Sequence, residues 1–134
     1  MLREARLQTV NSGVKSMAGE GVTDCQAFAT ALNLLGAFLA VRPDMPATHI
    51  CSFLVVAMEE GLGVHEYAAR AAIPPTTMTR HLLDLGSMTR RRVPGLGLLI
   101  QRMDPMDMRK HQTFLTPQGK ALAHKVMRII KHGR

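Results

Sequence analysis

Hydroxyl and arginine side chains gather in residues 76–92, and their chemistry suits contacts to a nucleic-acid duplex. A threonine hydroxyl can donate or accept a hydrogen bond at a base edge, and an arginine can make two hydrogen bonds to guanine. Consecutive arginines can also neutralise phosphates. On these grounds we expect DNA contacts from Thr76, Thr77, Thr79, Arg80, His81, Arg90, Arg91 and Arg92.

A second basic group surrounds the polar stretch "DPMDMRKHQTFLTPQGKAL" at 104–122. Asp-Pro suits the start of a turn, so we expect a hairpin with strands over 98–103 and 110–115, joined by a turn over 104–109. The cations at its tip could neutralise phosphates or enter a narrow groove. These cations are Arg102, Arg109, Lys110 and His111.

Apolar and acidic residues complete this expected hairpin. Leu99, Phe114 and Leu115 lie at its base, where they would tether it to a core. Asp104 and Asp107 would accept hydrogen bonds from turn amides and orient a nearby arginine through a charge-assisted bond. We therefore expect a charged tip above an anchored base.

The net charge of +7 is unevenly distributed along the 134 residues. Residues 1–60 hold four Lys/Arg and six Asp/Glu, whereas residues 61–134 hold thirteen and four. Such an imbalance indicates an anionic partner for the second half. Nucleic acid is the leading candidate, a membrane surface is a weaker one, and a charge that only aids solubility is the plain alternative.

The sequence contains no motif typical of a metal site or of an enzyme active site. His65-Glu66 does not begin a His-Glu-x-x-His motif, because position 69 is alanine, and no Cys-x-x-Cys occurs. No nucleophile–base pair, paired carboxylates or phosphate-cradling glycine loop stands out. We expect scattered exposed histidines, no enzyme activity, no metal and no cofactor.

The two cysteines and the apolar runs bear on location. Cys25 and Cys51 do not form a disulfide framework, which favours a reducing interior. Cys25 next to a helix N-terminus leaves redox sensing open, whereas Cys51 in an apolar helix is expected to be inert. Charged residues interrupt any signal peptide, and the apolar runs at 34–41 and 53–58 are too short to cross a bilayer. The expected location is cytoplasmic and nucleoid-associated, without a membrane partner.

The elements that position these residues follow from apolar periodicity and helix-stop signals. After a polar N-terminal arm over 1–20, apolar spacing predicts helices over 24–41, 47–60, 64–72, 76–85 and 117–132. The first has one wide apolar face, and the second is apolar almost all round, as a central helix would be. Thr116-Pro117 supplies the cap and first residue of the last helix. Residues 86–97 are expected to form a loop.

This order of elements indicates a mainly α fold with a small β-hairpin. Three helices, the last two joined by a tight turn and followed by a hairpin, are typical of a winged helix-turn-helix. In such a fold 76–85 is the second helix of the turn and 98–115 is the wing. The exposed face of that helix would meet the major groove.

The run "GLLIQRMDPMDMRKHQTFLTPQGKAL" resembles the wing signature of the MarR family of winged-helix transcriptional regulators. The upstream run "GLGVHEYAARAAIPPTTMTRHLLDL" is similar to the helix-turn-helix of the same family. The resemblance covers about residues 47–122. It implies a homodimer that binds two half-sites of a pseudo-palindromic operator, and we expect this regulator to be a repressor. It also implies that the helix over 76–85 enters the major groove and that Arg109 in the wing reaches the minor groove.

The resemblance divides the chain as one domain over 1–134. Residues 1–45 would form an N-terminal arm and dimerisation helix, 46–115 the winged helix-turn-helix, and 116–134 a C-terminal dimerisation helix. Flanking dimerisation helices would thus enclose the DNA-binding part in the sequence.

Four departures from the family pattern affect these expectations. Met108 replaces the first arginine of the wing pair, and Pro74 replaces a serine cap at the start of the recognition helix. Ala72 stands where a glycine often sits, so it carries strain if its φ is positive. The loop over 86–97 is longer than usual and holds Arg90, Arg91 and Arg92.

Several alternatives stay open at this stage. A small-molecule effector is possible but unsupported, because aromatic residues make up only 4% and tryptophan is absent. A winged helix can also serve as a protein-interaction module, since a fold alone does not determine function. A weakly specific architectural DNA binder is the third possibility.

Overall fold

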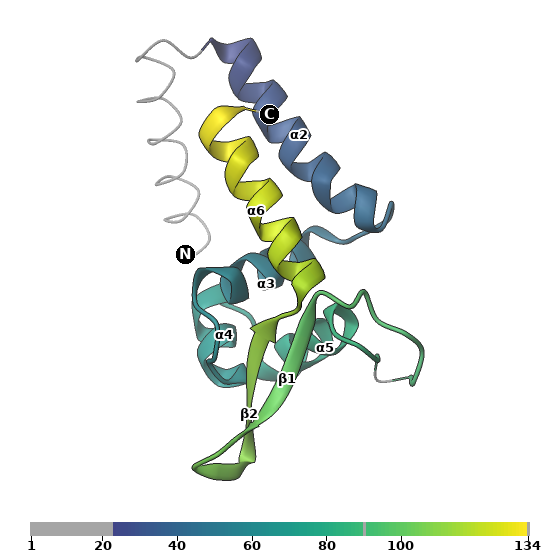
Figure 1. Cartoon of the computed structure of the whole chain (residues 1–134), viewed down its shortest axis with the longest axis vertical. Helices are drawn as coiled ribbons and strands as arrows, with labels where there is room; N and C mark the ends of the chain where they lie inside the picture. Colours follow the sequence, from purple (N-terminus) through teal and green to yellow (C-terminus); the bar gives the residue numbers. More distant parts are fainter. Residues whose placement is uncertain (1–22, 90, 134) are drawn as a thin grey trace.

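The computed structural model describes residues 23–89 and 91–133, and the expected arm over 1–20 lies outside them. These residues form helices and one antiparallel hairpin, so the expected fold class is confirmed. The elements in chain order are α2 (Asp24–Val41), α3 (Ala47–Met58), α4 (Val64–Ala71), α5 (Pro75–Leu85), β1 (Leu99–Asp104), β2 (Asp107–Leu115) and α6 (Pro117–His132) (Figure 1).

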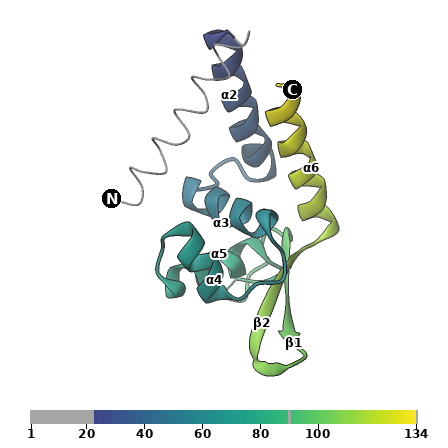
Figure 2. The ribbon, with the colours of Figure 1, turned by 90° about the vertical axis from the view of Figure 1, so that its left-hand side faces the viewer.

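The molecule has two parts, which both side views show (Figures 1 and 2). α2 and α6 lie side by side at one end, where Asn33 Nδ2 donates to the carbonyl of Gly133 at 3.4 Å. α3, α4, α5 and the hairpin make up the other end. The rings of Phe38 in α2 and Phe53 in α3 meet edge to face, with centroids 5.6 Å apart, and join the two parts through the core.

Threonine caps explain where the two long helices begin. Thr23 Oγ1 accepts from the amide of Gln26 at 3.1 Å, and Gln26 Oε1 accepts from the amide of Thr23 at 3.0 Å. This reciprocal pair satisfies two amides at the start of α2. At α6, Thr116 Oγ1 accepts from the amide of Gly119 at 3.1 Å, and Pro117 is the first helical residue. Both starts agree with the sequence.

α3 is the central helix, as expected, although it ends at Met58 rather than at 60. It buries Ile50, Ser52, Phe53, Val55 and Val56 against the other helices. Cys51 nevertheless lies on the exposed side of α3, as Cys25 does in α2, and both are free thiols. An apolar helix in the middle of a small fold therefore still has one face open to solvent.

α2 differs from its expected packing. The wide apolar face predicted for this helix buries only Ala37 and Phe38. Leu34 is half-buried against the core, and the other large apolar side chains stay exposed, with Phe28 at 77% and Leu32 at 72%. Most of the apolar surface of α2 therefore has no partner among the described residues, and its burial contributes little to stability.

The α4–α5 turn contains an alanine in a left-handed conformation. Ala72 ends α4 with φ 56° and ψ 45°, the strain expected if a glycine position held alanine. Pro74 then precedes α5 without a side-chain cap, and α5 begins at Pro75, one residue earlier than expected. Met78, Leu82 and Leu85 of α5 face the core, as predicted.

The hairpin has a tighter turn than expected, and its second strand is longer than expected. β1 and β2 pair from Leu99 opposite Leu115 up to Asp104 opposite Asp107, so only Pro105 and Met106 remain in the turn. Arg109 consequently lies on β2 and not in the expected six-residue turn, which corrects the boundaries predicted from sequence, whereas Lys110 and His111 lie on the second strand as predicted.

The base of the hairpin is tied to the turn between α3 and α4. The amide of Gly61 donates to the carbonyl of Thr113 at 2.8 Å, and the amide of Thr113 donates to the carbonyl of Leu62 at 3.2 Å. The buried Tyr67 hydroxyl donates to the carbonyl of Glu59 at 2.7 Å. Leu99 is buried and Phe114 and Leu115 are half-buried, as the anchoring role predicted.

Gly119 sets the approach of α6 to the hairpin base. A Cβ at this position would lie 2.1 Å from the carbonyl oxygen of Leu98, so no side chain fits there. The Thr116 hydroxyl also donates to the carbonyl of Gly97 at 2.6 Å, and its amide donates to that of Leu98 at 3.0 Å. α6 therefore rests directly on the backbone that enters β1.

Candidate nucleic-acid interface

The outward face of α5 carries most of the base-contacting residues predicted from sequence. Thr76, Thr79 and Arg80 are exposed, and Thr77 is half-buried. The hydroxyl of Thr79 donates to the carbonyl of Pro75 at 2.9 Å, which leaves its oxygen lone pairs as acceptors for a partner. These four side chains are brought together on one helix, next to its N-terminus.

His81 does not belong to this face, so the expectation that it points outward is wrong. Its side chain is buried at 7% exposure, where Nδ1 lies 2.8 Å from Ser52 Oγ. The Ser52 hydroxyl donates to the carbonyl of Thr48 at 3.0 Å, so it accepts from His81 Nδ1. Residue 81 follows residue 78 by three positions, and this helical spacing could have indicated an inward side chain.

A second histidine stacks on His81, so the expectation of scattered exposed histidines fails for this pair. The rings of His49 in α3 and His81 in α5 have centroids 4.3 Å apart. His49 Nε2 lies 2.9 Å from Asp84 Oδ2. Burial lowers the pKa of His81, His49 lowers it further, and Asp84 opposes both. The described residues contain no cluster of three His, Cys, Asp or Glu suited to a metal ion.

The loop after α5 is an ordered ribbon in the residues described, with Arg90 outside them. Met88 and Pro94 form an isolated antiparallel bridge, and the amide of Thr89 donates to the carbonyl of Val93 at 2.8 Å. Arg92 turns the chain with a left-handed φ of 59°. Arg91 and Arg92 are exposed at this turn.

Glycine allows this ribbon to return along the end of α5. A Cβ on Gly95 would lie 2.2 Å from the carbonyl oxygen of Gly86 and 2.9 Å from that of Asp84. The amides of Leu96 and Leu98 donate to the carbonyls of Asp84 and Leu85 at 3.0 and 2.8 Å. The turn that holds Arg91 and Arg92, here called the arginine turn, is thus fixed by backbone hydrogen bonds to α5, the helix that carries Arg80.

An open hollow of about 940 Å³ lies between α5 and the arginine turn. Arg80 and Arg91, two predicted DNA contacts from separate elements, both border it. Arg42 lines it as well, and its Nε also donates to Asp44 Oδ1 at 2.8 Å. The full lining is Arg42, Arg80, Asp84, Thr89, Arg91, Val93, Pro94 and Leu96.

The hairpin holds its predicted cations in the open. Arg102, Arg109, Lys110 and His111 are all exposed. The guanidinium of Arg102 lies over the ring of Phe114, 5.4 Å from its centroid, which restrains the side chain.

Asp104 and Asp107 have the local role predicted for them. Asp104 Oδ1 accepts from the amide of Met106 at 2.8 Å, and Asp107 Oδ1 accepts from that of Arg109 at 3.0 Å. Arg109 Nε lies 4.0 Å from Asp107 Oδ1, so this carboxylate also faces the arginine.

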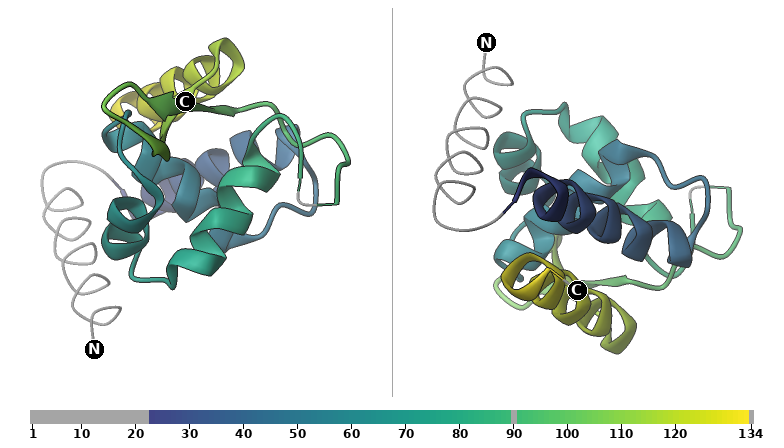
Figure 3. Two further views of the ribbon diagram at one scale, coloured as in Figure 1. Left: turned by 90° about the horizontal axis from the view of Figure 1, so that it is seen from below. Right: turned by 90° about the horizontal axis from the view of Figure 1, so that it is seen from above.

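α5 lies between the two basic segments. In Figure 1 the hairpin descends on one side of α5 and the 86–97 loop extends on the other. Viewed from below (Figure 3, left), α5 crosses the middle with the hairpin and the loop on opposite sides. The predicted contacts therefore share one end of the molecule, although they come from three separate elements.

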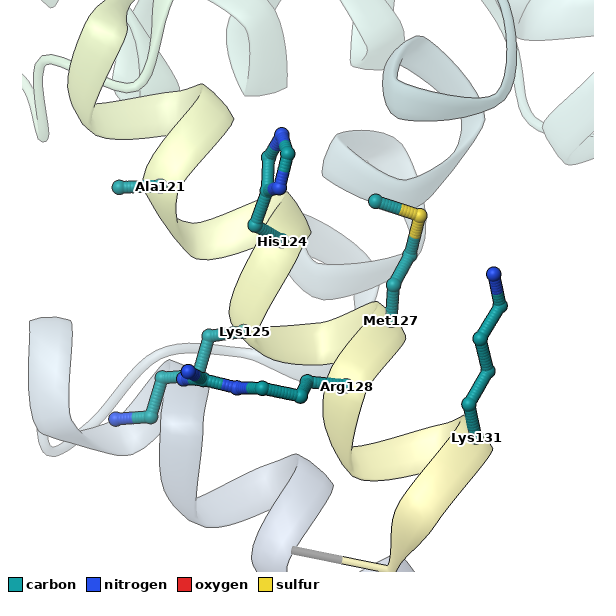
Figure 4. A pocket seen from close by; sticks show the side chains of 6 residues that line it. All are labelled: Ala121, His124, Lys125, Met127, Arg128 and Lys131. Atoms are coloured by element: carbon teal, nitrogen blue, oxygen red, sulfur yellow. The ribbon is translucent and has the colours of Figure 1, made fainter.

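A further basic group lies on α6, at the other end of the molecule. A shallow depression of about 400 Å³ has all of its described lining residues on α6, and Figure 4 shows their side chains. Its lining residues are Ala121, His124, Lys125, Met127, Arg128 and Lys131. The basic excess of residues 61–134 is thus divided between two ends and does not form one face.

Comparisons with known proteins place the fold. No protein-family model matches the chain, and no curated protein matches it. Solved structures do match, among them a MarR-like regulator from Thermotoga maritima, with 24% identity, 81% of this chain and 75% of that chain covered, and a TM-score of 0.53. A MarR regulator from Methanosarcina mazei matches with 14% identity, 92% and 76% coverage, and a TM-score of 0.56.

The fold is the MarR winged helix. A third match is BpsR from Bordetella bronchiseptica, whose structure concerns regulation of its DNA binding by 6-hydroxynicotinic acid. It shares 21% identity, covers 76% of this chain and 73% of that chain, and has a TM-score of 0.52. In this fold α5 is the second helix of the helix-turn-helix and the hairpin is the wing.

α2 corrects one expectation about membranes. Among the described residues, it alone is long and apolar enough to meet the length and composition criterion for a membrane-spanning helix. The apolar run at 34–41 is too short by itself to cross a bilayer, but the whole of α2 has 18 residues. The same criterion is met by helices of many proteins that cross no membrane, so it is weak support for a span.

Proposed function

We propose that this protein is a sequence-reading transcriptional regulator that binds double-stranded DNA and represses by occupying its operator. The observation that carries the proposal is the exposed threonine and arginine face of α5, set between the wing and the arginine turn. The MarR-like fold supports it, because the similar structures are those of transcriptional regulators.

The contacts divide into two kinds. Thr76, Thr77, Thr79 and Arg80 read base edges in the major groove, where an arginine recognises guanine through two hydrogen bonds. Arg90, Arg91 and Arg92 bind phosphates, and Arg109 with its neighbours in the wing meets the minor groove. The phosphate contacts supply a salt-dependent affinity, and the base contacts supply sequence preference.

A homodimer accounts for the exposed apolar face of α2. Phe28, Leu32, Leu35 and Leu39 repeat at intervals of four, three and four residues, which is the spacing of a helix seam. Met127 and Ile130 of the adjacent α6 are also exposed, at 45% and 51%. A second copy would cover this surface through a two-fold axis and present two recognition helices to a palindromic site.

The same surface bears on location. We call Phe28, Leu32, Leu35 and Leu39 the α2 stripe. A cytoplasmic, nucleoid-associated protein would bury this stripe against α2 of a second copy, whereas a membrane protein would bury it in lipid. Asn33 of α2 bonds to the carboxyl end of α6, so another face of α2 is already used by protein. We propose the dimer and the cytoplasmic location.

Selection of random duplex DNA at physiological salt, followed by sequencing, tests the function. Enrichment of a two-fold related motif, with half-sites about 10 base pairs apart, is the expected result. Binding without enrichment would instead support a weakly specific architectural protein. Failure to bind any duplex would overturn the proposal in favour of a protein-interaction module.

A further inference from the structure

Three methionines surround the tip of the wing, and the proposed DNA contacts leave them without a role. Met106 is 93% exposed, Met108 is 72% exposed and Met103 is 55% exposed. Apolar side chains this open contribute little to stability, since nothing in the described part of the chain covers them. Three within six residues form a local apolar group and not single scattered exposures.

The turn places Met106 at the extreme end of the hairpin. Only Pro105 and Met106 lie between the last paired residues, Asp104 and Asp107. Both carboxylates accept hydrogen bonds from backbone amides, at 2.8 Å from Met106 and 3.0 Å from Arg109. The acidic groups are therefore engaged with the ribbon itself, and an apolar Pro-Met pair forms the tip.

Cations follow directly behind this apolar tip. Arg109 and Lys110 on β2 and Arg102 on β1 are exposed, and Arg102 is restrained over Phe114. A narrow ribbon with an apolar end and basic flanks is complementary to a duplex groove, where phosphates line the edges and base pairs form the floor. Met108 supports this arrangement, because it adds apolar surface beside the cations.

We propose that the methionine tip, Met106 flanked by Met103 and Met108, is an apolar wedge that inserts at a base step in the minor groove and bends the duplex. The inference rests on the proposed function and specifies how the wing would act. Methionine and proline are among the side chains able to unstack a base step. Flexible pyrimidine–purine steps unstack most readily, so we expect one beneath each wing, outside the half-site that α5 reads.

Apolar insertion has a signature that phosphate contact lacks. A lysine that binds phosphate releases counterions, so its removal lowers the dependence of affinity on salt. A wedge releases none. Met106→Ala should therefore weaken binding about tenfold at every salt concentration, with an unchanged slope of log K against log salt. Lys110→Ala should lower the slope by about 1.

The test uses the full-length protein and its selected duplex, with 2-aminopurine at the step beneath the wing and a dye pair at the duplex ends. Unmodified protein should raise the 2-aminopurine fluorescence and shorten the end-to-end distance. Met106→Ala should lose both changes, and Met106→Leu should keep them. Met58→Ala is the matched control, since Met58 is 78% exposed in the α3–α4 corner, away from the tip.

Two results would overturn the wedge while leaving the proposed function intact. One is a Met106→Ala protein that binds and bends the duplex as well as the unmodified protein. The other is tight binding by unmodified protein with no rise in 2-aminopurine fluorescence at any step beneath the wing. A protein that binds no duplex at all would overturn both proposals. Met106 is so exposed that circular dichroism should report the same fold in each variant.

Discussion

At the residue scale, a pair of stacked histidines lies beneath the outward face of α5. His81 is held by Ser52 of α3, and His49 of α3 is held by Asp84 of α5. Each of the two helices thus contributes one histidine that hydrogen-bonds to a polar side chain of the other helix. This network positions α5 on α3, and burial lowers the pKa of its buried member, His81, so that the neutral ring is favoured.

The stability of the protein should fall as pH decreases through the histidine range. Burial lowers the folded-state pKa of His81 below its unfolded value of 6.5, so protonation favours the unfolded chain. The contribution is complete above pH 6.5 and is lost as pH falls toward the lowered value. Thermal unfolding from pH 8 to pH 5 measures this loss, which His49 increases and Asp84 reduces.

His81→Gln should flatten this pH dependence, because an amide can bond to Ser52 without titrating. His65→Gln, at an exposed position of α4, should leave the profile unchanged. If both variants followed the same curve as the unmodified protein, His81 would not be the titrating group.

Arg80 and Arg91 border one hollow, yet they should differ in effect on DNA binding. Arg80→Ala removes a base contact, which should cost about 1–3 kcal/mol on the preferred duplex and relax the preference at one base position. Arg91→Ala removes a phosphate contact and should weaken all duplexes alike, with a salt slope lower by about 1. Titrations of the selected duplex and a scrambled one, at several salt concentrations, separate the two roles. Identical behaviour of the two variants would contradict the division.

At the element scale, the α4–α5 turn carries strain that its sequence made foreseeable. Ala72 occupies the left-handed region, where a Cβ costs about 1–2 kcal/mol. Ala72→Gly should stabilise the protein by about 1 kcal/mol, after the greater entropy of an unfolded glycine is subtracted. The melting temperature should rise by about 4 °C in a calorimetric scan.

A second glycine substitution provides the control for this turn. Ala69 lies on an exposed helical position of α4, so Ala69→Gly should destabilise by about 1 kcal/mol. A fall in melting temperature for Ala72→Gly as well would mean that the left-handed conformation of residue 72 is not a source of strain.

The order and type of the elements were predictable from local patterns, and their edges were less so. Apolar spacing located the helices to within two residues, because Thr23, Thr116 and Pro117 mark their ends locally. The hairpin strands extend further than predicted, since the Asp104 and Asp107 side chains close a two-residue turn. Contacts between elements, such as His81 with Ser52, leave no local signal beyond helical spacing.

At the scale of the whole molecule, the unpaired stripe of α2 makes the association of two copies testable. Leu32→Asp puts a charge in the middle of the exposed stripe and should convert a dimer into a monomer, because burying an unpaired carboxylate costs several kcal/mol. Sedimentation equilibrium measures the mass, and operator affinity should fall with it. Helical content should stay the same, since Leu32 is 72% exposed.

Ala29→Asp tests whether any new charge on α2 would have the same effect. Ala29 is exposed but lies off the stripe, so this variant should remain a dimer. A monomeric unmodified protein at micromolar concentration would contradict the proposed assembly. Flotation of the unmodified protein with phospholipid vesicles would assign the stripe to a membrane instead.

The distribution of charge could not be predicted at this scale. Sequence counts place the basic excess in residues 61–134, but α6 begins at the base of the wing and runs away from α5 toward the other end of the molecule. Lys125, Arg128 and Lys131 therefore lie at the end opposite the candidate interface. The basic charge counted in the sequence therefore does not all face one anionic partner, because neighbours in sequence are not neighbours in space.

The contact at Gly119 gives the molecule a mechanical property. No side chain fits between α6 and the Leu98 carbonyl, and Thr116 bonds to both Gly97 and Leu98. We therefore expect α6 and the wing to move together as one rigid unit. In the proposed dimer, a change in the crossing angle of the paired helices would swing both wings. The distance between the two wing tips would then depend on the crossing angle of the paired helices, and so would the affinity for a duplex that both wings contact.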